Sequence, residues 1–587
     1  MDSGEGTTVE EGLALHRAGR LPEAEAVYER VVARDPSNAD ALHYLGVIAS
    51  QQGEQQRSVE LISRAIALKP DQPKFHNNLG VALRELKQLP EAQAAFSRAI
   101  GLNPAFNDAR NNSAGLLMLL GRTAEAIAQY RELLAAQPDF ADGWNQLGVA
   151  FKETKSPDEA ARCFREVIRL APNSMIGHVN LASALNDLKR HGEAESASRA
   201  ALGLQPDEPN ALANLAAALL GQFRATESLA VAESLLRLKP DDSASHLAVA
   251  LATHSLGDCD RALAAFTHVT TLKPDHASAH FCRANILLLQ GRLAEGFAEY
   301  EWRSRVPQMS HLHKALPRPR WKGEPLGGRR ILVHAEQGAG DTFNLMRYLP
   351  LVAARGGPVL FQCQGNLVRL LNRIGGATAV FCESEAPPAY DVEAPLMSLP
   401  FIFGTTLETI PGQPPLAPHA GRVVALPETG SMKVGLVWAG NPTHSNDRNR
   451  SMALALFEPV LALEGIDFFS LQVGPRSADR NQLPQPERLK DLSGQLEDYT
   501  TTAGVIQQLD LVLSVDTSVV HLAGVLGRPV WTLLPFVPDW RWLLERADSP
   551  WYPTMRLFRQ RREGDWPEAI RRVCAELEIL RDGLPPR

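Results

Sequence analysis

The sequence predicts a chain of two structural classes: an α-solenoid of helical hairpins, followed by an α/β region with parallel sheets. Three observations support this prediction. Prolines recur every 34 residues through the first half of the chain, the repeat ends in a segment rich in Pro, Gly and Arg, and short apolar strands then alternate with helical segments. That alternation is typical of parallel sheets covered by helices on both faces.

Each repeat holds two helical patterns with apolar residues at positions i, i+3, i+4 and i+7. A proline follows the second helix and ends it, at Pro36, Pro70, Pro104, Pro138, Pro172, Pro206, Pro240 and Pro274. This helical hairpin resembles the tetratricopeptide repeat. We expect about nine units from near Thr7 to near Leu312, the last one degenerate, in a superhelix that spans residues 1–312. Such arrays usually bind polypeptide in a concave groove.

Side-chain amides recur at one position of successive units, at Asn78, Asn112, Gln146, Asn180 and Asn214. An amide can donate to a peptide carbonyl and accept from a peptide N–H. A row of amides can therefore grip an extended backbone without reading its side chains. The row resembles the asparagine ladder of the O-linked N-acetylglucosamine transferases, which implies a groove that holds an acceptor protein. The alternative is that these amides satisfy helix groups within the stack.

The repeat stops between about Pro307 and Arg330, and residues 313–330 are expected to form a linker or interdomain strap. Two series of strands and helices follow. They predict two Rossmann-like lobes, at residues 331–420 and 421–587, that face a cleft. The Pro-rich segment 411–422 is the expected hinge between the lobes.

Polar clusters follow four of the predicted strands, where doubly wound sheets bind their ligands. In the first cluster, Gly338 and Gly340 let the backbone turn tightly and approach a ligand. Asp341 is then placed at a helix N-terminus, either facing the cleft or serving only as an N-cap.

The second cluster is the loop 438–451, in which Asn441, Arg448 and Arg450 offer amide and cationic donors for a phosphate. The alternative is a long solvated loop. In the third cluster, Gln472 is a candidate contact to a base or ribose.

The fourth cluster begins where a buried strand ends at Asp516 and a helix starts at Thr517 and Ser518. Free N–H groups at a helix start attract anions. His521 lies one turn further on the same face. We therefore expect a diphosphate cradle here, against the alternative of a helix cap and a core histidine.

The segments "GAGD" and "VDTSVVHLAGVLGRPV" together resemble the family 9 glycosyltransferases, heptosyltransferase-like enzymes of the GT-B fold. Their pattern is Asp-Thr-Gly/Ala-x-x-His-Leu-Ala, from which only Ser518 departs. Segments 441–451 and 538–560 look like a bacterial subfamily in which this domain follows tetratricopeptide repeats.

The resemblance implies inverting transfer of a sugar from a nucleotide-sugar. It implies that Asp341 is the catalytic base, that the loop with Arg448 and Arg450 supplies a cationic diphosphate ligand, and that the donor-binding set is Asp516, Thr517, Ser518 and His521. No cofactor or metal is expected, because no Asp-x-Asp pair follows a strand.

Composition limits the other function classes. The formal net charge of -7 gives no support to nucleic-acid binding. The six cysteines form no Cys-x-x-Cys pair, so neither a zinc nor a disulfide framework is expected. The acidic start lacks the features of a signal peptide, and no apolar run reaches the roughly 18 residues of a membrane span. The expected location is the cytoplasm.

We therefore expect a protein glycosyltransferase that modifies Ser or Thr of a client held by the repeats, with flagellin glycosyltransferases as one analogue. An enzyme of envelope polysaccharide assembly, of the heptosyl type, is an alternative in which the repeats recruit partners. A non-catalytic scaffold with a degenerate transferase module is the contrasting hypothesis.

Overall fold

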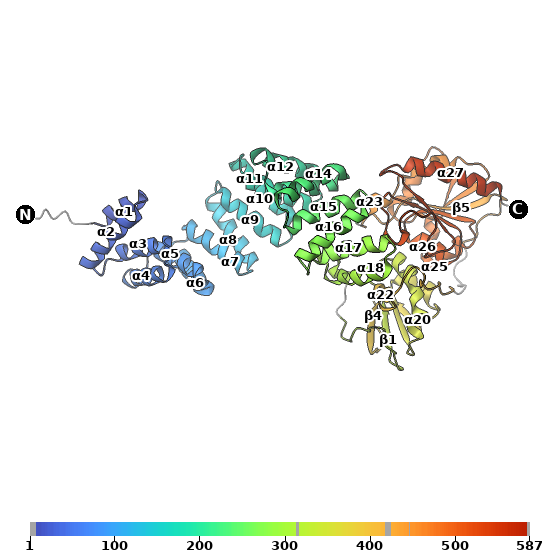
Figure 1. Cartoon of the computed structure of the whole chain (residues 1–587), viewed down its shortest axis with the longest axis horizontal. Coiled ribbons are helices and arrows are strands. Elements are labelled where there is room, and N and C mark those ends of the chain that lie inside the picture. The colour runs from blue at the N-terminus through green and yellow to red at the C-terminus, as the bar shows by residue number, and fades with distance from the viewer. Residues whose placement is uncertain (1–7, 313–315, 417–423, 445, 584–587) are drawn as a thin grey trace, which may run out of the picture. The chain divides into compact units, whose positions relative to one another are not determined.

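The computed structural model describes residues 8–312, 316–416, 424–444 and 446–583 (Figure 1). The chain divides into two compact units, Met1–Lys239 and Pro240–Arg587. The boundary falls inside the repeats, so the last two helical hairpins cluster with the α/β region rather than with the first seven.

The first unit is built from α1 to α14, paired as antiparallel hairpins. Their bounds are Val9–Arg17, Leu21–Arg34, Ala39–Gln51, Gln55–Leu68, Pro73–Glu85, Leu89–Leu102, Asn107–Leu119, Thr123–Ala136, Ala141–Glu153, Pro157–Leu170, Met175–Asp187, His191–Leu204, Pro209–Gly221 and Ala225–Leu238.

Glycine lets the two helices of a hairpin approach closely. A Cβ atom on Gly80 would lie 2.6 Å from the Phe96 ring, and one on Gly148 would lie 2.5 Å from the Phe164 ring. Both rings are fully buried. Ring packing between the paired helices thus explains the glycines at these two positions.

The second unit begins with two further hairpins, α15 (Ser243–Ser255), α16 (Cys259–Leu272), α17 (Ala277–Leu289) and α18 (Leu293–Tyr300). The last helix is short and gives way to the 3-10 turns η1 (Glu301–Arg305) and η2 (Pro307–Leu312). Nine hairpins are therefore present in the described residues, the last degenerate, as the sequence predicts.

The N-lobe holds a parallel four-stranded sheet in the order β3-β2-β1-β4, with β1 (Ile331–His334), β2 (Val359–Cys363), β3 (Ala379–Cys382) and β4 (Val392–Pro395). Its helices are α19 (Ala339–Leu345), α20 (Leu349–Ala353), α21 (Gly365–Leu371) and α22 (Leu399–Ile402), with the 3-10 turns η3 (Met346–Tyr348) and η4 (Leu396–Ser398).

The C-lobe holds a parallel six-stranded sheet in the order β10-β9-β8-β5-β6-β7. The strands are β5 (Met432–Val437), β6 (Ile466–Ser470), β7 (Leu489–Asp491), β8 (Leu511–Val515), β9 (Val530–Leu534) and β10 (Met555–Arg559). This is the strand order of dinucleotide-binding Rossmann sheets.

The C-lobe helices are α23 (Asp447–Arg450), α24 (Glu458–Leu461), α25 (Tyr499–Ile506), α26 (Ser518–Val525) and α27 (Trp566–Asp582). Five 3-10 turns complete it: η5 (Leu454–Phe457), η6 (Pro475–Gln482), η7 (Pro486–Arg488), η8 (Ser493–Gln495) and η9 (Trp540–Trp542). One buried core joins β5, β6 and β8 to α27.

The described part of the expected linker is packed against the N-lobe. Trp321 is buried, and its backbone N–H donates to Glu393 in β4 at 2.8 Å. Leu326 N–H donates to the Arg355 carbonyl at 2.7 Å. These contacts fit the strap interpretation rather than a free linker. Of the expected hinge, residues 417–422 lie outside the described residues.

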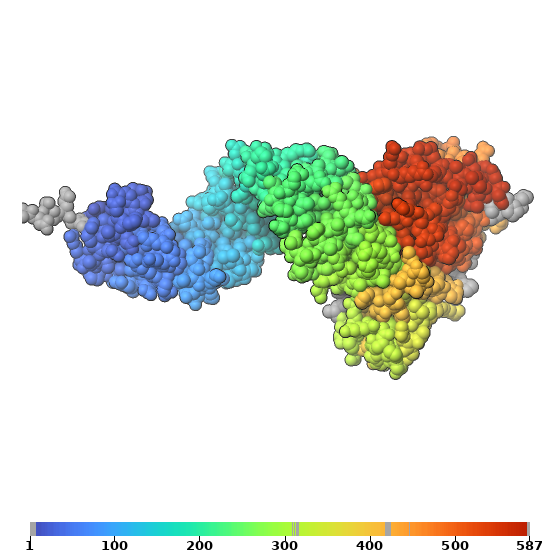
Figure 2. All heavy atoms as spheres, in the orientation of Figure 1, coloured from blue at the N-terminus to red at the C-terminus, as the bar shows by residue number. Residues whose placement is uncertain are grey.

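Within the second unit, both lobes contact the last repeat. α18 packs against α22 of the N-lobe, and α17 packs against η9 of the C-lobe. Figure 2 shows the green atoms of these repeats against the yellow atoms of the N-lobe and the red atoms of the C-lobe. This arrangement brings three parts of the sequence together at one place.

Candidate functional site

Both sheets reverse their strand order beside the predicted clusters. In the N-lobe, β2 and β4 lie on opposite sides of β1, and in the C-lobe, β6 and β8 lie on opposite sides of β5. Crevices at such reversals are where open α/β sheets bind ligands. The loops after β1, β5 and β8 carry the predicted residues, so three of the four predicted clusters lie at the reversals.

Asp341 is the third residue of α19 and takes part in a capping arrangement. Its Oδ2 accepts a hydrogen bond from the Gly338 backbone N–H at 2.9 Å. Its Oδ1 contacts the Arg541 guanidinium of the C-lobe. Burial raises the pKa of Asp341 and Arg541 opposes that rise. Asp341 therefore caps its own helix with one oxygen and contacts the other lobe with the second.

α19 and α26 pack directly against each other. A Cβ atom on Gly340 would lie 2.9 Å from Cδ2 of His521 and 3.4 Å from its Nε2. The glycine that the sequence singles out thus lets the backbone approach His521, a residue of the other lobe. Residues 338–341 and 516–521, far apart in sequence, meet at the lobe junction.

His521 is fixed by aromatic neighbours. Its Nδ1 lies 3.0 Å from the Tyr552 hydroxyl, and its ring stacks on Trp542 with centroids 5.2 Å apart. Burial holds the pKa of His521 well below its usual value, and the arginines Arg541, Arg347 and Arg450 lower it further. The imidazole is therefore neutral and can donate to an anion through one nitrogen only.

Arg541 is a central residue of the site that sequence reasoning missed. Its guanidinium contacts Asp341, and its Nη1 donates to Asp539 at 2.7 Å. The side chain lies over the Trp540 ring, with 4.2 Å between the guanidinium carbon and the ring centroid. A weaker signal was available, because Asp539 and Arg541 lie in the loop after the buried strand β9, whereas Asp516 follows β8 directly.

Asp516 lies among these charges. Burial and the neighbouring Asp539 raise its pKa to about 6, while Trp542, Arg450 and Arg541 act in the opposite direction. The same two arginines influence His521. Cations and carboxyl groups from the ends of β1, β5, β8 and β9 thus form one electrostatic cluster, which we call the junction cluster: Asp341, Arg450, Asp516, His521, Asp539 and Arg541.

The hydroxyls of Thr517 and Ser518 have partners within the protein. Thr517 Oγ1 lies 3.2 Å from the Ser514 hydroxyl, and Ser518 Oγ lies 2.7 Å from the Tyr499 hydroxyl. The Tyr499 ring in turn packs edge-on against Phe343 of α19. Ser518 is thus linked through Tyr499 to the other lobe, whereas the partner of Thr517 lies in its own lobe.

The loop after β5 is organised by Asp447, which is buried. It accepts from Ser451 and from Arg476, each at 2.6 Å. Asp447 thus ties the loop to Arg476. Arg450 packs against Gly440, where a Cβ atom would lie 2.8 Å from Nη2.

Asn441 and Arg448 are both exposed. Asn441 Oδ1 accepts from the Thr443 backbone N–H at 3.0 Å and from its hydroxyl at 2.9 Å, which shapes the turn. Of the three residues predicted in this loop, only Arg450 is in the junction cluster.

Gln472 has a structural role that the sequence interpretation did not foresee. The side chain is buried, and its Oε1 accepts from the backbone N–H groups of Trp438 and Ala439 at 3.2 and 3.0 Å. Its Nε2 donates to the Val473 carbonyl at 3.2 Å. The amide thus satisfies the end of β5, and a contact to a base or ribose stays a prediction.

The amide row of the first unit uses its N–H groups within the stack. Asn112 donates to Asn77 at 2.9 Å and Asn180 donates to Asn145 at 2.8 Å. Asn214 donates to the Val179 carbonyl at 3.0 Å.

The two remaining positions differ. Asn78 lies 2.9 Å from His43, whereas Gln146 is exposed. Each hydrogen-bonded amide reaches back to the preceding hairpin. The amide N–H groups therefore bond within the stack, as the alternative interpretation predicts. Groove binding stays a prediction, and it depends on the amide oxygens.

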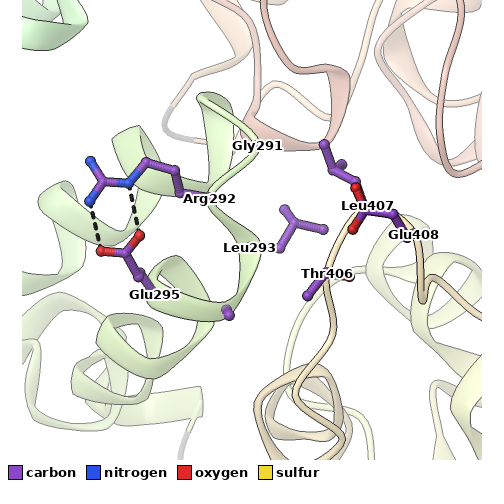
Figure 3. Close-up of a pocket in the computed structure, with 8 residues that line it drawn as sticks. Gly291, Arg292, Leu293, Glu295, Thr406, Leu407 and Glu408 are labelled. Atoms are coloured by element: carbon purple, nitrogen blue, oxygen red, sulfur yellow. Dashed lines mark hydrogen bonds and ion pairs between the residues drawn. The ribbon is translucent and has the colours of Figure 1, made fainter.

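Two cavities lie outside the junction cluster. One of about 190 Å³ separates α18 from the segment after α22, with Leu293 and Leu407 on opposite sides (Figure 3). It is smaller than the roughly 300–1,000 Å³ of ordinary ligand pockets. The other, of about 730 Å³, is in the first unit, where Trp144, Phe151 and Arg131 line it. The Arg131 guanidinium lies over the Phe151 ring at 5.4 Å.

No cluster of three or more His, Cys, Asp or Glu side chains in the described residues is arranged to hold a metal ion. None of the described helices combines the length and the hydrophobicity needed to cross a bilayer.

Comparison with known proteins identifies the repeats. The family profile described as tetratricopeptide repeat matches residues 9–73, 77–141, 145–209 and 247–302. The protein FlbA of Caulobacter vibrioides is 28% identical over 329 residues, which cover 51% of this chain and 54% of FlbA. The chain thus matches about half the length of this curated relative.

Solved structures with similar repeats include YrrB, described as a tetratricopeptide repeat protein with an unusual peptide-binding site, MamA, and PilF of Pseudomonas aeruginosa. For YrrB the identity is 18% and the TM-score 0.30, over 32% of this chain and 96% of that one. MamA gives 24% and 0.26, over 27% and 93%. PilF gives 19% and 0.32, over 36% and 96%. The helical hairpins of this chain are therefore tetratricopeptide repeats, followed by an α/β region with two parallel sheets.

Proposed function

We propose that the chain is an inverting glycosyltransferase that moves a sugar from a nucleotide-sugar to an acceptor hydroxyl. One observation carries this proposal: the junction cluster, in which the carboxylate of Asp341 contacts Arg541 of the other lobe and α19 packs against α26. A base and an anion-binding group on opposite lobes are what displacement at a sugar carbon requires.

The residues divide the chemistry between the lobes. The acceptor oxygen attacks the anomeric carbon while its proton moves to Asp341, and the bond to the diphosphate oxygen breaks with its electron pair. Arg450 and Arg541 compensate the charge that develops on the leaving diphosphate. The neutral His521 and the first N–H groups of α26 add fixed donors there.

The acceptor is proposed to be Ser or Thr of a client protein, as in flagellin glycosylation, and the setting to be the cytoplasm. The tetratricopeptide repeats support a polypeptide partner. The alternative acceptor is a saccharide of envelope assembly, with the repeats recruiting other proteins.

A non-catalytic scaffold is the second candidate. It is favoured by the repeats, which are sufficient for client binding, and by the ion pair that occupies Asp341. In that case the junction cluster binds a nucleotide without turnover, or only joins the lobes.

The Asp341→Asn variant tests the enzyme. Calorimetry of the full chain against UDP-, GDP-, ADP- and CMP-sugars identifies the donor, and release of free nucleotide with mass gain on co-purified client proteins reports turnover. We expect the variant to retain binding and to lose transfer by about 10²-fold or more, since general-base catalysis contributes about 10²–10⁴-fold.

Asp548→Asn is the matched control, because Asp548 forms an exposed ion pair with Arg546 in the same lobe. It is expected to behave as the unmodified protein. Transfer by Asp341→Asn at the unmodified rate would remove this residue as the base. Binding without turnover for every donor and client would favour the scaffold.

A further inference from the structure

Arg541 holds the candidate base. One nitrogen of its guanidinium contacts Asp341 Oδ1, and another donates to Asp539 at 2.7 Å. The arginine is only 6% exposed, and its face rests on Trp540. This is a buried cation shared between two carboxylates, one of which is the proposed base.

The pairing conflicts with base catalysis. A general base must have an oxygen within hydrogen-bond reach of the hydroxyl that it deprotonates. In the structure, one oxygen of Asp341 accepts from Gly338 and the other contacts Arg541. Hydrogen bonds to the charged form weaken a carboxylate as a proton acceptor. While the pair with Arg541 persists, Asp341 is therefore a weaker base.

Donor capacity for an anion remains in the cluster. The Nε groups of Arg541 and Arg450 are both buried, and neither forms a hydrogen bond with any residue that the structure describes. Buried donors without partners are rare because they are costly. A phosphate accepts two parallel hydrogen bonds from one guanidinium, which would satisfy such a donor.

We propose that Arg541 is a donor-sensing arginine, which exchanges Asp341 for the phosphates of the nucleotide-sugar and thereby frees the base only when the donor is bound. This proposal rests on the proposed function. On donor binding, Arg541 moves its hydrogen bonds from Asp341 to the diphosphate, while Asp539 keeps the side chain in place. Asp341 then accepts the proton of the acceptor hydroxyl, and Arg541 receives the leaving diphosphate.

The exchange makes Asp341 a competitor of the nucleotide. Calorimetry of the full chain with UDP, GDP, ADP and CMP measures this competition. For the nucleotide that binds best, we expect Asp341→Asn to tighten binding about tenfold and Arg541→Ala to weaken it about tenfold or more, as removal of one charged hydrogen-bond partner implies. In the Arg541→Ala background, Asp341→Asn should change affinity by less than about twofold, because the shared partner is gone.

Two controls separate the exchange from misfolding. Arg546→Ala removes a half-buried arginine of the same lobe whose partner Asp548 is exposed, and it should leave affinity unchanged. Arg541→Lys keeps the positive charge but loses the two parallel hydrogen bonds that a guanidinium can form, so it should also weaken binding. It takes the place of Arg541→Ala in the test if that variant fails to fold.

The outcomes distinguish the two proposals. An unchanged affinity in Asp341→Asn, or the same gain with and without Arg541, overturns the exchange but leaves the transferase intact. Failure of the unmodified protein to bind any of the four nucleotides overturns the transferase, and the exchange with it.

Discussion

Gly340→Ala tests the closest approach of the two lobes. The added Cβ would lie 2.9 Å from Cδ2 of His521, whereas carbon atoms prefer about 3.5–4.0 Å. The imidazole cannot turn away easily, because it is stacked on Trp542 and bonded to Tyr552. Either the ring or α19 must therefore move by about 0.5–1 Å.

The magnitude follows from two opposing terms. Overpacking of a tight core costs about 1–3 kcal/mol. Replacing glycine by alanine in a helix contributes at most about 1 kcal/mol of stabilisation, and less at the second residue of α19. We expect the free energy of unfolding of the second unit to fall by about 1–2 kcal/mol.

A double-mutant cycle with His521→Ala isolates the contact. Removing the imidazole leaves space for the new methyl group, so the double variant should be about 1–2 kcal/mol more stable than the sum of the single effects predicts. Eight of the nine tryptophans lie in residues 240–587, so tryptophan fluorescence during urea unfolding reports mainly on this unit. Gly504→Ala in α25 is the matched control, because a Cβ there meets nothing within 4 Å. Additive effects of Gly340→Ala and His521→Ala would refute the packing argument.

Two further predictions concern the repeats and the pH dependence of stability. Gly148→Ala should destabilise the first unit by about 1–3 kcal/mol, because its Cβ would lie 2.5 Å from Phe164. Gly203→Ala, in open space on α12, should be neutral or stabilising by up to about 1 kcal/mol. Thermal unfolding followed by circular dichroism compares the two variants. The pKa of Asp516 is raised in the folded state to about 6 from 3.8, so the folded protein retains a proton that the unfolded chain has lost. The contribution of this residue to stability therefore falls as pH rises from about 4 to 6. Asp516→Asn should remove that fall, seen as a flatter melting temperature between pH 4 and 7 than in the unmodified protein; parallel curves would contradict the shift.

The repeats could be predicted in detail because their signal is local. Apolar spacing, small residues and a terminal proline each act within a single hairpin. Residues 340–356 do not form one continuous helix, since the segment is divided into α19, a 3-10 turn and α20. Pro350 lies at the start of α20, where a proline is tolerated, and it cannot donate a hydrogen bond to a preceding turn.

The strands β4, β7 and β10 and the helix α27 were not predicted. β4 and β7 are short, and β7 is only partly buried. Their assignment depends on pairing with neighbours that are distant in sequence, such as β1 for β4. Sequence periodicity does not report such pairing.

In the site, too, local patterns could be predicted from the sequence and tertiary contacts could not. Strand-end reasoning located Asp341, Asp516 and His521, because each follows a buried strand of a parallel sheet. It did not distinguish Arg450 from Arg448, since orientation in a loop depends on tertiary contacts such as Gly440. Gln472 was predicted to contact a ligand because a side-chain amide can bond to a nucleotide. The same amide can equally bond to backbone N–H groups at a strand end, as it does here.

Trp540 explains why the last repeat belongs with the α/β region. Phe297 and Tyr300 of α18 pack on the Trp540 ring, with centroids 5.4 and 6.4 Å away, and Arg541 lies on the same indole. The Tyr300 hydroxyl also accepts from Gln337 of the loop that leads to Asp341, at 3.1 Å. The last repeat therefore contacts the immediate neighbours of both Asp341 and Arg541. A cut at residue 312, where the repeat pattern ends, would remove these supports, whereas a cut at residue 240 would keep them. The junction cluster thus draws its residues from the two lobes, and the terminal repeat supports it through Trp540 and Gln337.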